Sequence, residues 1–202
     1  KLTLPDGTLV WLNAGSRITY SQGFGVGNRK IELIGEGYFE VKRNEEVPFL
    51  VKTNSLLVKV LGTKFNFRDY PDDAEAIVSL SEGKVALNNL LKKEKEAFLL
   101  PNERVVLNKK NGRMHVEYST VSNALQWTNG YLFFDEELLP DVVKELERSY
   151  NVKIQIASDT LNTFRFYGNF VHREQNIQEV LEALSATRKI HYIIEGHNIT
   201  LY

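Results

Sequence analysis

The chain has 202 residues, of which 43% are apolar and 25% charged, as in an ordinary folded globular protein. Its 25 basic and 26 acidic residues give a net charge of −1, which argues against nucleic-acid binding, since that shows as a basic excess. The absence of cysteine excludes thiolate nucleophiles, disulfides and cysteine-ligated zinc. No segment has the ~20 apolar residues of a membrane helix, and no signal peptide is recognisable.

Residues 1–118 show the period-2 alternation of β-strands. Apolar side chains alternate with polar ones in 49–52, 58–60 and 65–68, with many aromatic and β-branched residues. Turn residues separate these segments at 5–7, 23–27, 35–37, 82–83 and 111–112. We therefore expect an all-β domain. Short strands divided by glycine fit a twisted sheet, a sandwich or a β-solenoid equally well.

Two loops stand out in this half. Asn111-Gly112 joins 105–107 to 114–116 and predicts a hairpin with a type I′ turn, because both residues tolerate a positive φ. The mixed charge run 92–96 lies between two strand-like segments, and we interpret it as a solvated hairpin loop.

From residue 119 onward the period changes to that of helices. Leu138, Val142, Leu146 and Tyr150 recur every four residues, and Pro140 falls in the first turn, where its missing N–H costs nothing. A second stripe follows in 177–184, at spacings i, i+3, i+4 and i+7. Asn176 and Glu179 are placed to form its capping box.

Strand-like segments flank each of these helices. They lie at 131–134 and 152–156 around the first, and at 164–170 and 190–194 around the second, followed by 199–201. The strand–helix–strand unit thus occurs twice. We predict an all-β domain at 1–118 and a small α+β domain with two βαβ repeats at 119–202.

The glycine cluster 23–27 could suggest a phosphate-binding loop. Such a loop has to open a helix, so that its N–H groups converge on the anion. The following segment, 29–34, is strand-like instead. We expect a flexible loop between two strands.

Glu36 and Glu40 would point to one face of a strand, together with Tyr38. Their separation of roughly 13 Å along the strand exceeds the roughly 5–9.5 Å between the carboxyl groups of glycosidases. We expect both acids to face solvent or to bond to turns.

The four histidines are His115, His172, His191 and His197, and none has the i, i+4 spacing of a helical metal pair. His191 and His197 flank the final hairpin. No serine lies in a strand-to-helix elbow. Because no nucleophile is paired with a base, the sequence predicts no enzymatic activity, no cofactor and no metal.

Several motifs occur in the order found in one family. They are Leu4-Pro5-Asp6-Gly7-Thr8, Leu12-Asn13-Ala14, Gly35-Glu36-Gly37-Tyr38-Phe39-Glu40-Val41, Pro48-Phe49-Leu50-Val51, Val60-Leu61-Gly62-Thr63-Lys64-Phe65-Asn66-Phe67 and Glu82-Gly83-Lys84-Val85. Together they resemble the FecR family of anti-sigma factors. The part from Trp127 to the end resembles the C-terminal, STN-like domain that accompanies FecR domains in Bacteroidetes-type bacteria.

This resemblance implies the periplasmic region of a single-pass inner-membrane protein, and the strand-like start at Lys1 is what we expect of an excised ectodomain. The implied partners are the periplasmic signalling domain of a TonB-dependent outer-membrane receptor and an extracytoplasmic-function sigma factor. The sigma factor would be reached through a cytoplasmic segment beyond a membrane helix, both absent from this chain. No nucleic-acid partner is implied.

We expect residues 119–202 to receive the receptor domain, by strand addition at an exposed edge or by packing of a sheet on helices. The β-rich part would be a rigid spacer. The candidate contact residues lie on the strand near 164–170, and they are Phe164, Phe166, Tyr167 and Phe170. The alternative is a secreted carbohydrate-binding β-domain protein.

Overall fold

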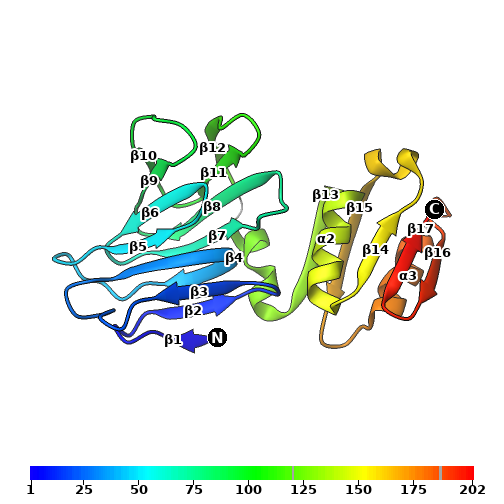
Figure 1. Ribbon diagram of the computed structural model, residues 1–202, viewed down its shortest axis with the longest axis horizontal. Coiled ribbons are helices and arrows are strands. Elements are labelled where there is room, and N and C mark those ends of the chain that lie inside the picture. The colour runs from blue at the N-terminus through cyan, green and yellow to red at the C-terminus, as the bar shows by residue number, and fades with distance from the viewer. Residues whose placement is uncertain (120, 187) are drawn as a thin grey trace. The chain divides into compact units, whose positions relative to one another are not determined.

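The computed structural model describes residues 1–119, 121–186 and 188–202. The chain divides into two compact units, Lys1–Thr128 and Asn129–Tyr202, which we call the β domain and the small domain (Figure 1). The predicted division at 118/119 precedes a segment with the helix α1 (Val121–Ala124) and the 3₁₀ helix η1 (Gln126–Asn129). Most of this segment belongs to the β domain, because α1 contacts a strand there and the Trp127 indole N–H donates to Asn66 Oδ1 at 3.3 Å.

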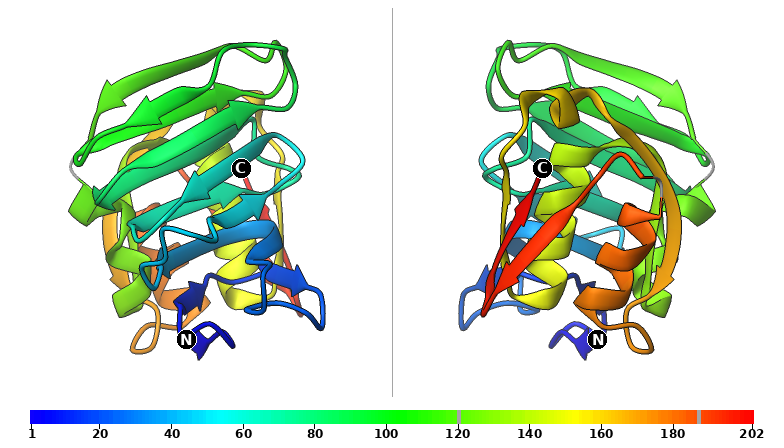
Figure 2. Two further views of the ribbon diagram at one scale, coloured as in Figure 1. Left: turned by 90° about the vertical axis from the view of Figure 1, so that its left-hand side faces the viewer. Right: turned by 90° about the vertical axis from the view of Figure 1, so that its right-hand side faces the viewer.

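The β domain contains twelve described strands. They are β1 (Leu2–Thr3), β2 (Leu9–Leu12), β3 (Arg17–Tyr20), β4 (Lys30–Glu40), β5 (Phe49–Lys52), β6 (Leu56–Val60), β7 (Lys64–Asp69), β8 (Glu75–Glu82), β9 (Val85–Asn89), β10 (Ala97–Leu99), β11 (Glu103–Asn108) and β12 (Met114–Tyr118). They form one hydrogen-bonded sheet in the order β10-β9-β6-β5-β4-β7-β8-β11-β12, and β2 and β3 also pair with β4. Successive strands turn relative to one another, which gives the sheet a strong twist (Figure 2).

Strand β4 belongs to both halves of this sheet. Its residues 31–34 pair with β3, and its residues 37–40 pair with β2 on the same side. On the other side it pairs with β5 at 30–32 and with β7 at 35–40. The change of partners takes place at Gly35, whose φ of +97° is accessible to glycine but strained for other residues.

The bend at Gly35 lets the two halves enclose one hydrophobic core. Phe39 and Phe65 contribute to it from one half and Phe49 from the other, and all three are fully buried. Their rings contact one another, with centroids 5.1 Å apart for Phe39–Phe65 and 6.2 Å apart for Phe39–Phe49. The predicted all-β domain is confirmed, and of the three architectures left open, the twisted sheet folded around its own core is the one formed.

The loop predictions are partly confirmed. The charge run 92–96 is an exposed loop between β9 and β10, and 23–27 is a loop between β3 and β4. The hairpin β11–β12 also forms, but its predicted type I′ turn is wrong, because only Gly112 has a positive φ. Instead Asn108 closes a longer loop, receiving a hydrogen bond from Gly112 N at 2.8 Å and donating one to Arg113 O at 2.9 Å. The side chain of Asn108 also accepts from Asn111 N, which favours this wider loop.

The small domain has the predicted order of elements. They are β13 (Tyr131–Leu138), α2 (Leu139–Tyr150), β14 (Lys153–Ile156), the 3₁₀ helix η2 (Asp159–Thr163), β15 (Arg165–Val171), α3 (Ile177–Ser185), β16 (Tyr192–Glu195) and β17 (Asn198–Leu201). Pro140 lies in the first turn of α2, and Asn176 and Glu179 form the expected capping box of α3. The two strand–helix–strand repeats are therefore confirmed.

The strands that flank each helix lie in different sheets. β13 pairs with β15, the first strand of the second repeat, whereas β14 pairs in parallel with β17, and β17 pairs with β16. The apolar stripes of α2 and α3 share one core with these strands. No described helix is long and apolar enough to cross a lipid bilayer, and α2 has only 12 residues.

The first prediction concerns the bend in β4. In Gly35→Ala the added Cβ would lie 2.9 Å from Ser16 Cα and closer still to Ser16 Oγ, at an unfavourable φ. We expect the free energy of unfolding to fall by about 3 kcal/mol in urea titrations. Gly23→Ala is the control, because its Cβ meets nothing within 4 Å and its φ is not positive, so it should have little effect. Equal stability of the two variants would contradict this role of Gly35.

Candidate functional site

The carboxylate of Glu36 is the centre of a buried polar cluster in the β domain. The side chain of Asn66 donates to Glu36 Oε1 at 2.7 Å, and those of Asn13 and Arg68 donate to Oε2 at 2.9 and 3.2 Å. Arg68 also pairs with Asp73 at 2.8 Å. Of the two expectations for Glu36, exposure to solvent is wrong, since it is only 4% exposed, and bonding to a turn is confirmed by its hydrogen bond from Asn13. Glu36 lies on the face of β4 opposite to Phe39, and its hydrogen bonds join β4 to β7 and to the turn after β2.

Tyr38 and Glu40 follow Glu36 on β4 and do not form a reactive pair. The Tyr38 hydroxyl donates to Glu40 Oε1 at 3.5 Å. Burial, followed by the charge of Glu40, raises the pKa of Tyr38 to about 12. The phenol therefore stays protonated at neutral pH and cannot act as a general base there.

A second buried ion pair connects the β1–β2 turn to the start of β4. Arg29 is 4% exposed, and its Nε donates to Asp6 Oδ2 at 2.8 Å. Its other nitrogens donate to the backbone carbonyls of Val47 and Lys42. Asp6 in turn accepts from the backbone N–H and the hydroxyl of Thr8. These contacts satisfy the buried charges locally, so the cluster has a structural role.

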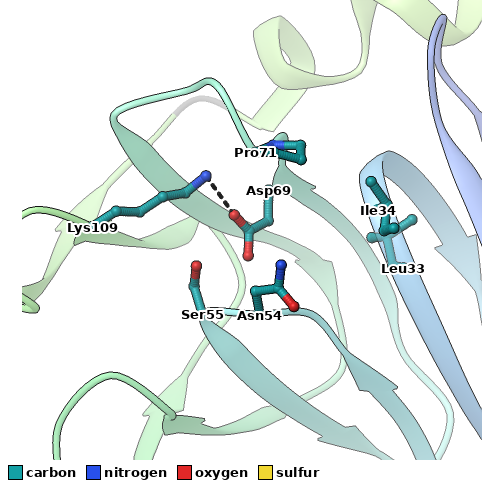
Figure 3. A pocket seen from close by; sticks show the side chains of 7 residues that line it. All are labelled: Leu33, Ile34, Asn54, Ser55, Asp69, Pro71 and Lys109. Carbon is teal, nitrogen blue, oxygen red and sulfur yellow. Dashed lines mark ion pairs between the residues drawn. The ribbon is translucent and has the colours of Figure 1, made fainter.

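A small hollow of about 140 Å³ lies beside the end of β7 (Figure 3). Asp69 and Lys109 form an ion pair in its wall at 2.7 Å, and Lys109 Nζ also donates to the Tyr70 carbonyl. Asn54 and Ser55 line the side facing Asp69, and Leu33, Ile34 and Pro71 complete the wall. The volume is below that of most ligand pockets, about 300 Å³ and above, and Lys109 neutralises the only buried carboxylate that lines it.

The described histidines do not converge on a metal site. Among residues 1–119, 121–186 and 188–202, no three His, Asp or Glu side chains are grouped so as to hold a metal ion. His191 and His197 lie at opposite ends of the final hairpin. His191 pairs with Tyr202 through two backbone hydrogen bonds, and His197 is in the turn between β16 and β17.

Of the four candidate contact residues, the structure exposes one. Phe166 and Phe170 are 6% and 5% exposed, and their rings stack in the core of the small domain with centroids 6.1 Å apart. Phe164 is half-buried against the same core, under the ammonium group of Lys189. Tyr167 is 59% exposed on the opposite face of β15. Phe166 and Phe170 are thus enclosed by the folded domain, and contact of Tyr167 with a partner stays a prediction.

The period of 2 along β15 separates these residues onto two faces from the sequence alone. Phe166 and Phe170 are four residues apart and therefore share a face with each other, and Tyr167 lies on the other face. The partner strand explains which face is inward, because Phe134 of β13 contacts both phenylalanine rings. On the outer side, a hydrogen bond with Glu136 raises the pKa of the Tyr167 hydroxyl.

Sequence reasoning missed the residues of β16. Ile193 and Ile194 are consecutive on this strand and are 50% and 40% exposed. Among the described strands, β16 is hydrogen-bonded to β17 on one side and to no strand on the other. An exposed apolar pair on an edge strand is a recognisable sequence signal, but it requires knowing that the final hairpin is not covered.

Comparison with known proteins places the whole chain in one family. The protein-family model described as "FecR protein" matches residues 1–86, and the model "FecR, C-terminal" matches residues 131–201. This chain belongs to the FecR family of anti-sigma factors. No curated protein matches it.

Two crystal structures described as a "putative anti-sigma factor" from Parabacteroides distasonis ATCC 8503 have the same fold. Each is 35% identical to this chain in sequence. The match covers 100% of this chain and 92% of the chain in the crystal structure. The TM-scores are 0.89 and 0.88. Members of this family are regulators, which agrees with the structural roles of the polar clusters described above.

The second prediction concerns the ion pair at the hollow. Lys109→Met removes the charge that compensates the buried carboxylate of Asp69, whose side chain is 3% exposed. We expect a loss of about 3 kcal/mol in the free energy of unfolding. The neighbouring exposed residue gives the control, Lys110→Met, which should change stability by less than about 0.5 kcal/mol. A Lys109 variant as stable as the control would show that the pair is dispensable.

The third prediction separates the two faces of β15. Phe166→Ala should cost about 3–5 kcal/mol, because it opens a cavity in the core of the small domain. Tyr167→Ala should change stability by less than about 0.5 kcal/mol. Chemical denaturation of both variants measures the difference, and a large loss for Tyr167→Ala alone would reverse our assignment of the faces.

Proposed function

We propose that this chain is the periplasmic sensor region of a FecR-like anti-sigma factor. In this proposal it binds the periplasmic signalling domain of a TonB-dependent outer-membrane receptor. The signal then passes, through a membrane helix and a cytoplasmic segment of the full-length protein, to an extracytoplasmic-function sigma factor. Family membership over the whole chain supports the regulatory part of this proposal.

The observation that carries the receptor-binding part is the surface of the small domain. It has strand edges without a neighbouring strand, and exposed Tyr167, Ile193 and Ile194 lie on two of these edge strands. Exposed apolar side chains on an unpaired edge are suited to contact with another protein chain. The small domain is therefore the receiving element of the proposed sensor.

The β domain supports the same function in another way. Its sheet encloses a single large core, and its buried charges are held by the partners described above. Such a domain can act as a rigid spacer between the membrane and the small domain. We propose no catalytic step in this chain.

The fourth prediction tests the proposal directly. The purified 202-residue chain is mixed with purified signalling domains of TonB-dependent receptors from the same organism, and complexes are detected by light scattering and titration calorimetry. We expect one of these domains to form a 1:1 complex. A signalling domain from an unrelated receptor system is the control and should not bind. If no domain from the complete set of the organism's receptors binds, the proposed function is wrong.

A further inference from the structure

The edge of β16 differs from the other free strand edges of the small domain. Among the described strands, β13, β14, β15 and β16 each have one edge without a hydrogen-bonded neighbour. Proteins protect such edges against unwanted pairing with charged residues, bulges or irregular backbone. We can therefore ask which of the four edges lacks this protection.

Three of the edges are protected. β13 has a bulge between Phe134 and Glu137, where Glu136 adopts a φ of +56° within the exposed acidic run 135–137. β14 presents Lys153 and Gln155 to solvent, and β15 presents Arg165 and Asn169 together with a glycine at 168. These features either carry charge or interrupt a regular ladder.

The fourth edge, that of β16, carries the sequence Tyr192-Ile193-Ile194-Glu195 without a bulge, a proline or a lysine. Ile193 and Ile194 point to opposite faces of the hairpin and are both exposed. β-branched residues on both faces favour a strand with close neighbours. Apart from Glu195 at its end, this edge therefore carries none of the features that protect the other three.

The register of the hairpin determines which backbone groups are open. His191 and Tyr202 exchange two hydrogen bonds, N–H to O at 2.9 and 3.0 Å. Because hydrogen-bonded and non-bonded pairs alternate along an antiparallel ladder, Ile193 and Glu195 also bond to β17. The N–H and C=O groups of Tyr192 and Ile194 consequently point away from β17, toward the open edge.

From these observations we infer that β16 is the docking edge for an extended strand of the receptor signalling domain, which adds to the sheet β14-β17-β16 as a fourth strand. This inference rests on the function proposed above and specifies where the contact takes place. The incoming strand would pair with the backbone of Tyr192 and Ile194. Its side chains would cover Ile194 on the core side and Ile193 on the outer side, where Tyr202 is also exposed (hairpin in red in Figure 2).

The charge of the small domain indicates what kind of chain docks there. Residues 129–202 contain 11 acidic and 7 basic side chains, a net charge of −4. Two copies of this domain would repel each other at such an edge, whereas a domain with a net positive charge would be attracted. The structure therefore favours a basic partner with an apolar strand over a second copy of this chain.

The fifth prediction uses proline at position 194. Ile194→Pro removes an N–H that points outward, so the β16–β17 ladder keeps its hydrogen bonds while an added strand loses a donor. We expect the affinity for the receptor signalling domain that binds the wild-type chain to fall about 30-fold, the result of losing one or two hydrogen bonds and close strand contact. Ile194→Thr keeps the N–H and should weaken binding by no more than about threefold.

A second variant tests the same edge independently, in case the proline variant misfolds. Ile193→Lys leaves the backbone intact and places a protective lysine on the outer face of the edge. It should also weaken binding by tenfold or more, with an unchanged circular dichroism spectrum and urea midpoint. All affinities are measured by titration calorimetry on the full 202-residue chain.

The outcomes distinguish the inference from the proposed function. If the wild-type chain binds a signalling domain and both Ile194→Pro and Ile193→Lys bind it equally well, the docking edge is elsewhere and the proposed function stands. If the wild-type chain binds no signalling domain, the proposed function fails. If the wild-type chain forms a dimer that Ile193→Lys dissociates, β16 pairs with a second copy and our choice of occupant is wrong.

Discussion

The bend of β4 at Gly35 is the constraint on which the β domain depends. One strand of 11 residues pairs with four others, and it can do so only because it changes direction between its two halves. Next to the bend, Glu36 lies on the face of β4 opposite to Phe39, where Asn13, Asn66 and Arg68 satisfy its charge. Without the bend the two halves of the sheet would not face each other, and the phenylalanines between them would lose their common core.

Much of this architecture was predictable from local patterns. Alternation of apolar and polar residues identified several strands of the β domain, and the stripe of α2 and the capping box of α3 identified both helices. Such signals come from residues close in sequence. The path of the sheet did not follow from them, because the pairing of β4 with β7 joins residues some thirty positions apart.

The predictions that failed also depended on contacts that local sequence patterns do not show. Glu36 was expected to face solvent or to bond to a turn, because a carboxylate is rarely buried. It does bond to the turn after β2, but its burial depends on Asn66 and Arg68, which are distant in sequence. The hairpin after β11 widened because the side chain of Asn108 competes for the backbone N–H of Asn111. On β15 the alternation was visible, but only the contact with Phe134 reveals which face is inward. The edge of β16 is open because no described strand pairs with it, and this cannot be predicted from a local sequence pattern.

The two domains thus have different roles in the function that we propose for this anti-sigma factor region. The β domain, whose buried charges are paired, is the proposed spacer, and the small domain offers the edge of β16 to an incoming chain. Amide hydrogen exchange, measured by NMR with and without the receptor signalling domain, tests this division most directly. The account predicts that the Phe39 amide exchanges slowly in both states, and that the amide of Ile194 exchanges rapidly in the free chain and becomes protected in the complex. Protection of Ile194 that does not change on binding would contradict the account.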